Sequence, residues 1–422
     1  MKVRPVVVAE AIFLSFVFFL ANIRSTIYWS LYPPVDSITE PAWRETFLWL
    51  VVLMLLYYLL RKYDLSRTYL QAWREQPILI VFVFFSLFSV FWSTAWNVTL
   101  HRCLAFVFGT AMAVYLGIRY SITELLRVLA ILGATILIAS CLLVFLNPAL
   151  GTAPNHPYYG AWRGIFWHKN QLGNILPIFT LVYLMYFFSP VNRSDFPRKV
   201  IVVFFYITSL VVILFSKSAS GYILVFLLHL AFGAAFIWLK VRRLLLPMHY
   251  FFAFVISVGV GVAVMFNLDF IFGLLGKEIT LTGRIPMWGI LMNEIFPMHP
   301  WLGQGFGTIW ADESFRILMS VLVDWSYPVM IGDNGFLDIL LNLGIVGLVF
   351  FLLNYFKAWF VSVKLFLQEL NLESFFPFIF MIYSLFANVS FSLFLETEIF
   401  VWILMVALMI SSTSIKRKLS LV

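Results

Sequence analysis

The residues best suited to chemistry lie in one long interval, Asn267–Gly347, which is not a plain apolar stretch. A connection of this length is usually functional or disordered, and its many Trp, Phe, Ile and Leu residues argue against disorder. Arg284 stands just ahead of Pro286, and proline is favoured in the first turn of a helix. The unpaired amides and the dipole of a helix start favour an anion. We predict that the interval forms the catalytic face and that Arg284 meets an anion there.

Two acidic residues close the same interval. Asp333 occupies an N-cap position before an apolar segment, and Asp338 lies about one turn into that segment. A carboxylate costs on the order of 2.5 to 3.5 kcal/mol at the centre of a bilayer and less near its edge. Asp338 therefore requires a partner or a wet cavity. Asp333 is either the helix cap or a group that reacts.

Between these sites the chain has a glycine-punctuated turn that begins at His299, followed by a segment with helical spacing. Its apolar residues recur at intervals of three and four, with charged residues on the other side, which predicts a helix lying in the membrane interface. The apolar set is Phe315, Leu318, Met319 and Leu322, and the charged set is Asp312, Glu313 and Arg316.

Positive charge also gathers in two shorter loops. Arg163, His168, Lys169 and Asn170 stand next to the start of an apolar segment at Gly173. Lys217 stands alone between two apolar segments, beside Gly221, whose missing side chain permits the close approach of a phosphate. Such residues often only anchor a helix end at the membrane surface. Their accumulation on one side of the membrane favours an anionic ligand instead.

The remaining polar residues give weaker signals. Glu396 and Glu398 follow the penultimate apolar segment, where acids commonly cap a helix. The six histidines have no i, i+4 pair and no carboxylate at a suitable offset, so we expect no structural metal. We also expect no cofactor. Cys103 and Cys141 both fall inside apolar segments, so we expect core residues rather than a disulfide.

Composition places these loops in a membrane protein. Of 422 residues, 63% are hydrophobic and 11% are charged, and the mean hydropathy is +0.97. A transmembrane helix needs roughly 20 mostly apolar residues. We predict an all-α integral membrane protein with about twelve spans and a long, partly helical extracytoplasmic loop before the tenth. The spans are 6–23, 46–60, 77–92, 100–118, 125–146, 173–188, 200–215, 221–239, 248–266, 334–356, 374–394 and 398–411.

The basic residues set the orientation. Most of the 28 Lys and Arg residues fall on the side of the N-terminus, so both termini are predicted in the cytoplasm and 267–332 outside it. The net charge of +8 is then a topology signal and gives little support to nucleic-acid binding. We divide the chain into N-terminal membrane helices, 1–147, and a catalytic membrane region, 148–422, with the extracytoplasmic loop 267–333.

The order of several motifs around this loop is informative. From about the fifth span onward the chain resembles the bacterial O-antigen ligase and exopolysaccharide polymerase family. The motifs are Gly164-IFWHKNQLGN, Ser216-KSASG, Thr282-GRIPMW, His299-PWLGQGFG, Asp333-NGFLDILLNLGIVG and Asn388-VSFSLFLETEIFVW. The resemblance implies a bacterial inner-membrane glycosyltransferase that moves a glycan from undecaprenyl diphosphate to an extracytoplasmic acceptor, without a metal or a nucleotide sugar. It also implies a flippase and a chain-length regulator as possible partners.

The resemblance assigns roles to the polar residues. Asp333 stands where ligases of this family carry a histidine held to activate the acceptor hydroxyl, which makes Asp333 the expected base. Arg284 is the second expected catalytic residue, because preorganised cations stabilise a departing diphosphate. Lys217 stands near the place of a family arginine and offers one point charge in place of a fork. The expected binding residues are Arg163, His168, Lys169, Asn170, Lys217, His299, Asn334 and Glu396, with Glu396 or His168 as the alternative base.

Several functions stay open at this point. Within the family, the missing histidine and the Trp-His-Lys-Asn run favour a polymerase of O-antigen or exopolysaccharide slightly over a ligase that attaches the glycan to lipid A core. A transporter or flippase of lipid-linked glycans would also need many spans and cations facing a cavity. Transporters commonly show repeated halves, and none is visible in this sequence. A non-enzymatic scaffold is disfavoured by the costly polar residues.

Overall fold

The computed structural model describes residues 43–154, 158–189, 196–242, 284–325, 329, 331–394 and 400–420. The predicted spans 6–23 and 248–266 and the candidate residue Glu396 lie outside these ranges. Within them the regular elements are helices, and a single isolated β-bridge joins Thr152 to Trp162. Cys103 and Cys141 are both unpaired thiols, as predicted, and Cys103 is buried.

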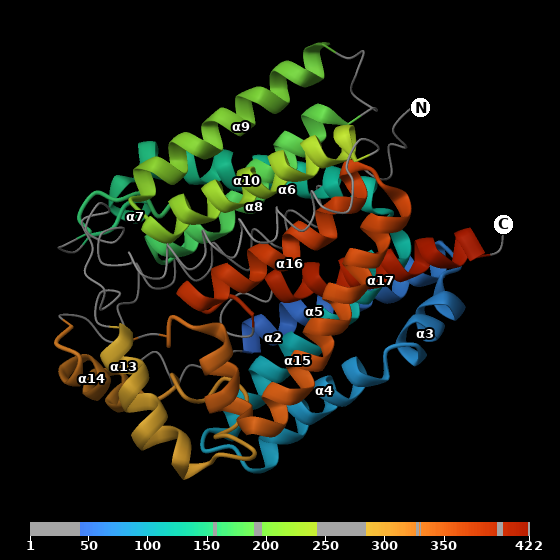
Figure 1. The fold of residues 1–422 in the computed structure, drawn as a ribbon. Coiled ribbons are helices and arrows are strands. Elements are labelled where there is room, and N and C mark those ends of the chain that lie inside the picture. Colours follow the sequence, from blue (N-terminus) through green and yellow to red (C-terminus); the bar gives the residue numbers. More distant parts are fainter. Residues whose placement is uncertain are drawn as a thin grey trace.

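The helices follow the apolar segments of the sequence closely (Figure 1). The first group is α2 Trp43–Lys62, α3 Ser66–Arg74, α4 Pro77–Phe88, η1 Ser89–Phe91, α5 Trp96–Arg119, α6 Ile122–Leu146, α7 Pro148–Gly151, α8 Lys169–Phe188, α9 Phe196–Ser216 and α10 Ala219–Val241. The second group is α13 Arg284–Ile290, η3 Leu291–Ile295, η4 Phe296–Met298, α14 Glu313–Leu322, α15 Gly335–Glu369, α16 Leu372–Ser390 and α17 Phe400–Ser420.

Seven of these helices, α5, α6, α8, α9, α10, α15 and α16, are long and apolar enough to cross a membrane. The pair α3 and α4–η1 also qualifies when its two parts are taken together, although they meet at 85°. The chain is therefore a multi-pass membrane protein. Every predicted span within the described ranges coincides with a helix, and the total of twelve stays a prediction.

Helix α8 is the centre of the bundle. In its apolar stretch 78% of the residues are buried, compared with 28% in α9 and 22% in α10. It packs against α6, α9, α10 and α16. The outward apolar side chains of α9 and α10 suit contact with lipid, whereas α8 is enclosed by protein and can hold polar residues at a fixed place.

The predicted tenth span is not one continuous helix, because α15 is broken at Gly344 (φ 66°, ψ −171°). The turn after His299 inserts at the break. The amides of Ile345 and Val346 donate to the carbonyls of Pro300 and Trp301, and the carbonyls of Leu341 and Asn342 accept from Gln304 and Gly305. A Cβ at position 344 would lie 2.2 Å from the Trp301 carbonyl oxygen. Irregular backbone is tolerated at membrane depth when protein pairs it in this way.

The segment before α15 has a small hydrophobic core of its own. Its buried members include Met287 of α13, Trp310, Met319 of α14 and Leu337 of α15. In the first part of α15, Leu337 and Leu341 belong to this second core, whereas Ile339 and Leu343 belong to the main core together with the part after Gly344. In Figure 1, α13 and α14 lie at the end of the molecule opposite α3 and the C-terminus.

The predicted apolar face of α14 is only partly correct. Met319 is buried, but Leu318 and Leu322 are exposed, together with Ile317 and Val321, whereas Arg316 is buried. The sequence pattern contains two apolar faces, and the second core takes one of them. The other is an exposed apolar stripe, as a helix in the membrane interface requires.

Candidate functional site

An ion pair joins Arg284, the first residue of α13, to Asp333, which lies just before α15. The Arg284 Nε donates to Asp333 Oδ2 at 2.8 Å, and the two side chains are 11% and 14% exposed. Within the described residues, the two terminal nitrogens of Arg284 have no hydrogen-bond partner. The carboxylate therefore fixes the guanidinium and leaves its outer edge for an anion, the geometry that suits a phosphate.

Burial changes the chemistry of Asp333. Desolvation raises the pKa of its carboxyl above the ordinary value, and the charge and hydrogen bond of Arg284 oppose that rise in pKa. The result is a carboxylate that holds a proton more readily than an exposed aspartate. This shift in pKa favours the role of a base.

Asp333 is not the cap of α15, which corrects one reading of the sequence. Asn334 is the N-cap, and its Oδ1 accepts from the amides of Phe336 at 3.1 Å and Leu337 at 3.2 Å. Asp333 stands one residue earlier with φ 50°, a left-handed conformation that aspartate tolerates better than most residues. This conformation directs the side chain towards α13 in place of the helix amides.

Trp288 supports the same pair. It lies four residues after Arg284 on α13, and residues at that spacing share one face of a helix. Its Nε1 donates to the Gly332 carbonyl oxygen at 2.8 Å. One face of α13 thus binds both Gly332 and Asp333, which fixes the turn that leads into α15.

Asp338 has the partners that its predicted place in the membrane requires. It is 3% exposed and accepts from Trp310 Nε1 at 2.8 Å, from the Gly332 amide at 3.3 Å and from the Ser392 hydroxyl. A cavity with about 10 Å³ of space for the centre of a water molecule lies beside it, roughly enough for one water. The expectation of a partner is confirmed.

His168 begins α8 as its N-cap. Its Nδ1 accepts from the amide of Asn170 at 3.2 Å, so the proton of the neutral ring is on Nε2. Burial, together with the charges of Lys169, Arg284 and Arg163, lowers the pKa of His168 from 6.5 to about 3. The imidazole is therefore neutral near pH 7 and offers an N–H donor. This argues against His168 as the alternative base.

Lys169 is buried at the first position of α8, with 2% of its surface exposed. Its Nζ donates to the Lys217 carbonyl oxygen at 2.9 Å and to Asn170 Oδ1 at 3.2 Å, and it lies 4.3 Å from the centre of the Tyr158 ring. The loop after α9 is thereby tied to the start of α8. The side chain of Lys217 itself is exposed.

Arg163 is mainly occupied with backbone. Its guanidinium donates to the carbonyls of Leu150 at 3.0 Å, Trp167 at 3.2 Å and Ala149 at 3.5 Å. Burial lowers the pKa of Arg163 below its ordinary value. Its contacts fit a residue that shapes the loop before α8 and adds positive charge from a distance.

The space beside Gly221, where a phosphate was expected to approach, is filled by the backbone of α8. A Cβ there would lie 2.5 Å from the Gly173 carbonyl oxygen, because the start of α10 packs directly against the first turns of α8. The close approach predicted for a phosphate is therefore made by the α8 backbone. Ser218 caps α10 by accepting from Gly221, and its hydroxyl lies 3.1 Å from that of Ser220.

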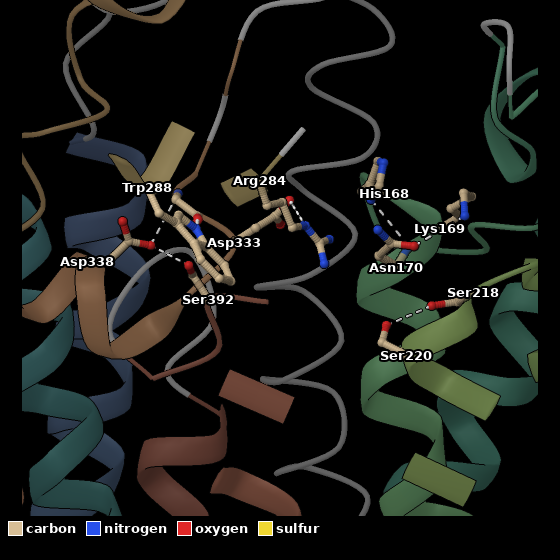
Figure 2. A network of polar contacts seen from close by, with 11 residues as sticks. His168, Lys169, Asn170, Ser218, Ser220, Arg284, Trp288, Asp333, Asp338 and Ser392 are labelled. Carbon is tan, nitrogen blue, oxygen red and sulfur yellow. Dashed lines mark hydrogen bonds and ion pairs between the residues drawn. The ribbon is translucent and has the colours of Figure 1, made fainter. Parts of the chain in front are cut away.

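Figure 2 shows how these groups lie. Arg284 extends from Asp333 towards the start of α8, where His168, Lys169 and Asn170 gather. The effect of Arg284 on the pKa of His168 agrees with this arrangement. His299 is exposed in the turn that fills the break of α15 and is absent from this cluster. The structure brings together Arg284, Asp333 and the α8 start from three separate stretches of sequence.

The sequence did not reveal Trp288, Trp310 or Ser392 as members of the site. Trp288 and Trp310 lie in an interval with many aromatic residues, and Ser392 lies in an apolar run, so none of them stands out by type. The buried Asp338 accepts from the Gly332 N–H and from the indole N–H of Trp310. The Gly332 carbonyl accepts from the indole N–H of Trp288. The signal available in the sequence was that a carboxylate at position 338, inside a membrane span, requires hydrogen-bond donors nearby.

The fold and this site define a multi-pass helical membrane protein with a buried arginine–aspartate pair at one end of the bundle. The model of the family described as O-antigen ligase matches residues 204–352, which supports the resemblance to the O-antigen ligase and polymerase family. The match contains Lys217, Arg284 and Asp333 and ends within α15. It indicates a membrane function in glycan handling of the O-antigen ligase or polymerase type. No curated protein matches the chain.

Proposed function

We propose that this protein is a glycosyltransferase that moves a glycan from undecaprenyl diphosphate to an acceptor hydroxyl outside the cytoplasm. The observation that carries the proposal is the Arg284–Asp333 pair, which places an anion-binding edge and a carboxylate side by side. The family match over the same residues supports it.

The donor's diphosphate binds to the terminal nitrogens of Arg284. The exposed ammonium of Lys217 and the Nε2–H of His168 contribute further positive charge and a hydrogen bond. Lys169, Asn170 and Asn334 hold this surface in shape, and Glu396 and His299 are candidates for contacts with sugar hydroxyls. Fixed cations stabilise charge that grows on a leaving group, without a metal being required.

Asp333 acts as the base. The acceptor oxygen attacks the anomeric carbon from the face opposite the diphosphate, its proton passes to Asp333, and the bond from the anomeric carbon to the diphosphate oxygen breaks. The products are the inverted glycoside and undecaprenyl diphosphate. The raised pKa of Asp333 makes this proton transfer easier than it is for an exposed aspartate.

The experiment uses the purified protein in bilayer nanodiscs with lipid-linked glycan from the strain that produces it. Release of undecaprenyl diphosphate that depends on added acceptor supports the transferase. Movement of intact lipid-linked glycan across a vesicle membrane, with no release, would make the protein a transporter.

We propose a polymerase in preference to a ligase, because Asp333 replaces the histidine implied for ligases. The glycan of a deletion strain distinguishes them. Chains of a single repeat unit indicate a lost polymerase, and long unattached chains indicate a lost ligase.

We further propose that the protein lies in the inner membrane with both termini in the cytoplasm, so that α13 and α14 face outside. The exposed position Ser314 offers the test. A Ser314→Cys variant should react with an impermeant maleimide in cells whose inner membrane is intact. Labelling that requires permeabilisation of that membrane would reverse the orientation.

A further inference from the structure

We propose that Asp338 is a positioning residue for Asp333 and acts on it through the Gly332 peptide. The inference rests on the proposed function of Asp333 as the base. Asp338 is a buried carboxylate that has no other role in the proposed reaction.

The Gly332 peptide is held from two sides. Its amide donates to Asp338 Oδ2 at 3.3 Å, and its carbonyl oxygen accepts from Trp288 Nε1 at 2.8 Å. Asp333 follows directly in a left-handed conformation, φ 50°. Because a left-handed conformation raises the free energy of a non-glycine residue, the surrounding contacts must impose it. Asp338 and Trp288 are the two side chains that hold the residue before it.

The carboxylate lies tightly against this backbone. A Cβ at position 332 would stand 2.4 Å from Asp338 Oδ1. A shift of the Asp338 side chain therefore transmits directly to Gly332. Figure 2 shows Asp338, Ser392 and Trp288 around Asp333 on the side away from α8.

Asp338 also connects three stretches of chain. Trp310 comes from the turn before α14, Gly332 from the turn before α15, and Ser392 from the segment after α16. A buried carboxylate is costly, and an apolar side chain would avoid that cost. Three donors, one from each stretch, bond to the carboxylate. Asp338 therefore fixes the relative positions of these stretches where they meet.

The central test is a double-mutant cycle of Asp338→Asn and Asp333→Asn in the nanodisc assay. Asn at 338 has a single acceptor oxygen, so it cannot accept from both Trp310 and Gly332, which bond to different oxygens of the carboxylate, and the defined geometry is lost. We expect Asp338→Asn to lower kcat by about 10²-fold, the loss typical of a misplaced reacting group. Affinity for undecaprenyl diphosphate, used as the binding probe, should change only a few-fold, because Arg284 stays anchored in α13.

The cycle separates positioning from a general structural role. If Asp338 acts through Asp333, adding Asp338→Asn to Asp333→Asn should cost little further activity per folded molecule. Fully additive losses, or an active Asp338→Asn enzyme beside an inactive Asp333→Asn enzyme, would overturn the inference. An active Asp333→Asn enzyme would instead contradict the proposed function itself.

One control variant and one independent test variant accompany the cycle. Trp310→Phe removes the donor to Oδ1 and leaves the Gly332 bond, so it should lose some stability and keep most of its kcat. Gly332→Ala pushes on the same carboxylate from the peptide side and should reproduce the fall in kcat. This variant also serves if Asp338→Asn does not fold, and a Gly332→Ala enzyme with normal kcat would then overturn the inference.

Discussion

The Nε of Arg284 donates to Asp333 at 2.8 Å, which fixes the guanidinium and leaves its two terminal nitrogens without a partner in the described part of the chain. A lysine at this position could bind either the carboxylate or a phosphate, but its single ammonium could not bridge both in the same geometry. The Nε of Arg284 therefore makes a structural bond, and the two terminal nitrogens of the same side chain form the proposed anion-binding edge.

Replacing Arg284 tests that edge. We expect Arg284→Ala to lower the rate of undecaprenyl diphosphate release by about 10² to 10³, the usual cost of a lost charge-stabilising donor. Arg284→Lys should remain well below wild type. Arg67→Ala, on exposed α3 at the opposite end of the molecule, is the matched control. Normal release by Arg284→Ala would remove the residue from the site.

Asp333 should give turnover a distinct pH dependence. Because burial raises the pKa of its carboxyl, the ionised base is lost on acidification at a higher pH than for an ordinary aspartate, near 3.9. We expect kcat to fall as the pH decreases, with a midpoint above that value. Asp333→Asn can still accept from Arg284 Nε but cannot take a proton. Retained turnover in that variant would leave Asp333 only the task of holding Arg284.

Asn334 can be tested as a cap independently of Asp333. Its loss in Asn334→Ala should reduce the free energy of unfolding by about 1 kcal/mol, and Asn334→Ser should largely restore it. Asn371, the N-cap of α16, is the matched control, because Asn371→Ala loses a similar cap elsewhere. Unfolding and turnover are measured for both. A fall in turnover confined to Asn334→Ala would indicate that Asn334 also contacts substrate.

His168 should make stability depend on pH. Its folded-state pKa is about 3 and its ordinary value is 6.5, so between these values the unfolded chain binds more protons. Stability should therefore be level above pH 6.5 and fall as the pH drops towards 4. The unfolding temperature in detergent measures this. His168→Asn keeps a capping side chain without a titrating ring, and an unchanged acid slope in this variant would assign the effect to other groups.

The break at Gly344 should be sensitive to any side chain. Gly344→Ala places a methyl group against the Trp301 carbonyl in a left-handed backbone, at a cost of at least about 1 to 3 kcal/mol. Gly233→Ala in α10 is the control, because nothing lies within 4 Å of its Cβ and alanine favours a helix. We expect opposite shifts in unfolding temperature. Equal tolerance at both positions would show that α15 accommodates a continuous helix.

The membrane helices and part of the site could be predicted from the sequence, because both are properties of neighbouring residues. Apolar runs of sufficient length predicted the spans that the structure describes. Pro286 lies in the first described turn of α13, and the high cost of Asp338 in a membrane predicted its buried partners. The cluster at the start of α8 is likewise contiguous in sequence.

Tertiary structure decided which residues meet. Asp338 pairs with Ser392 and Trp288 with Gly332 across 54 and 44 residues, and no local pattern specifies where two such distant backbones approach. The choice between Asp333 and Asn334 as the cap depended on a left-handed turn that Arg284 holds from another helix. The break in α15 depended on a turn some 40 residues earlier in sequence order, whose carbonyls and amides satisfy the interrupted helix. Hydropathy records how much of a segment is apolar, whereas these contacts depend on the path of the whole chain.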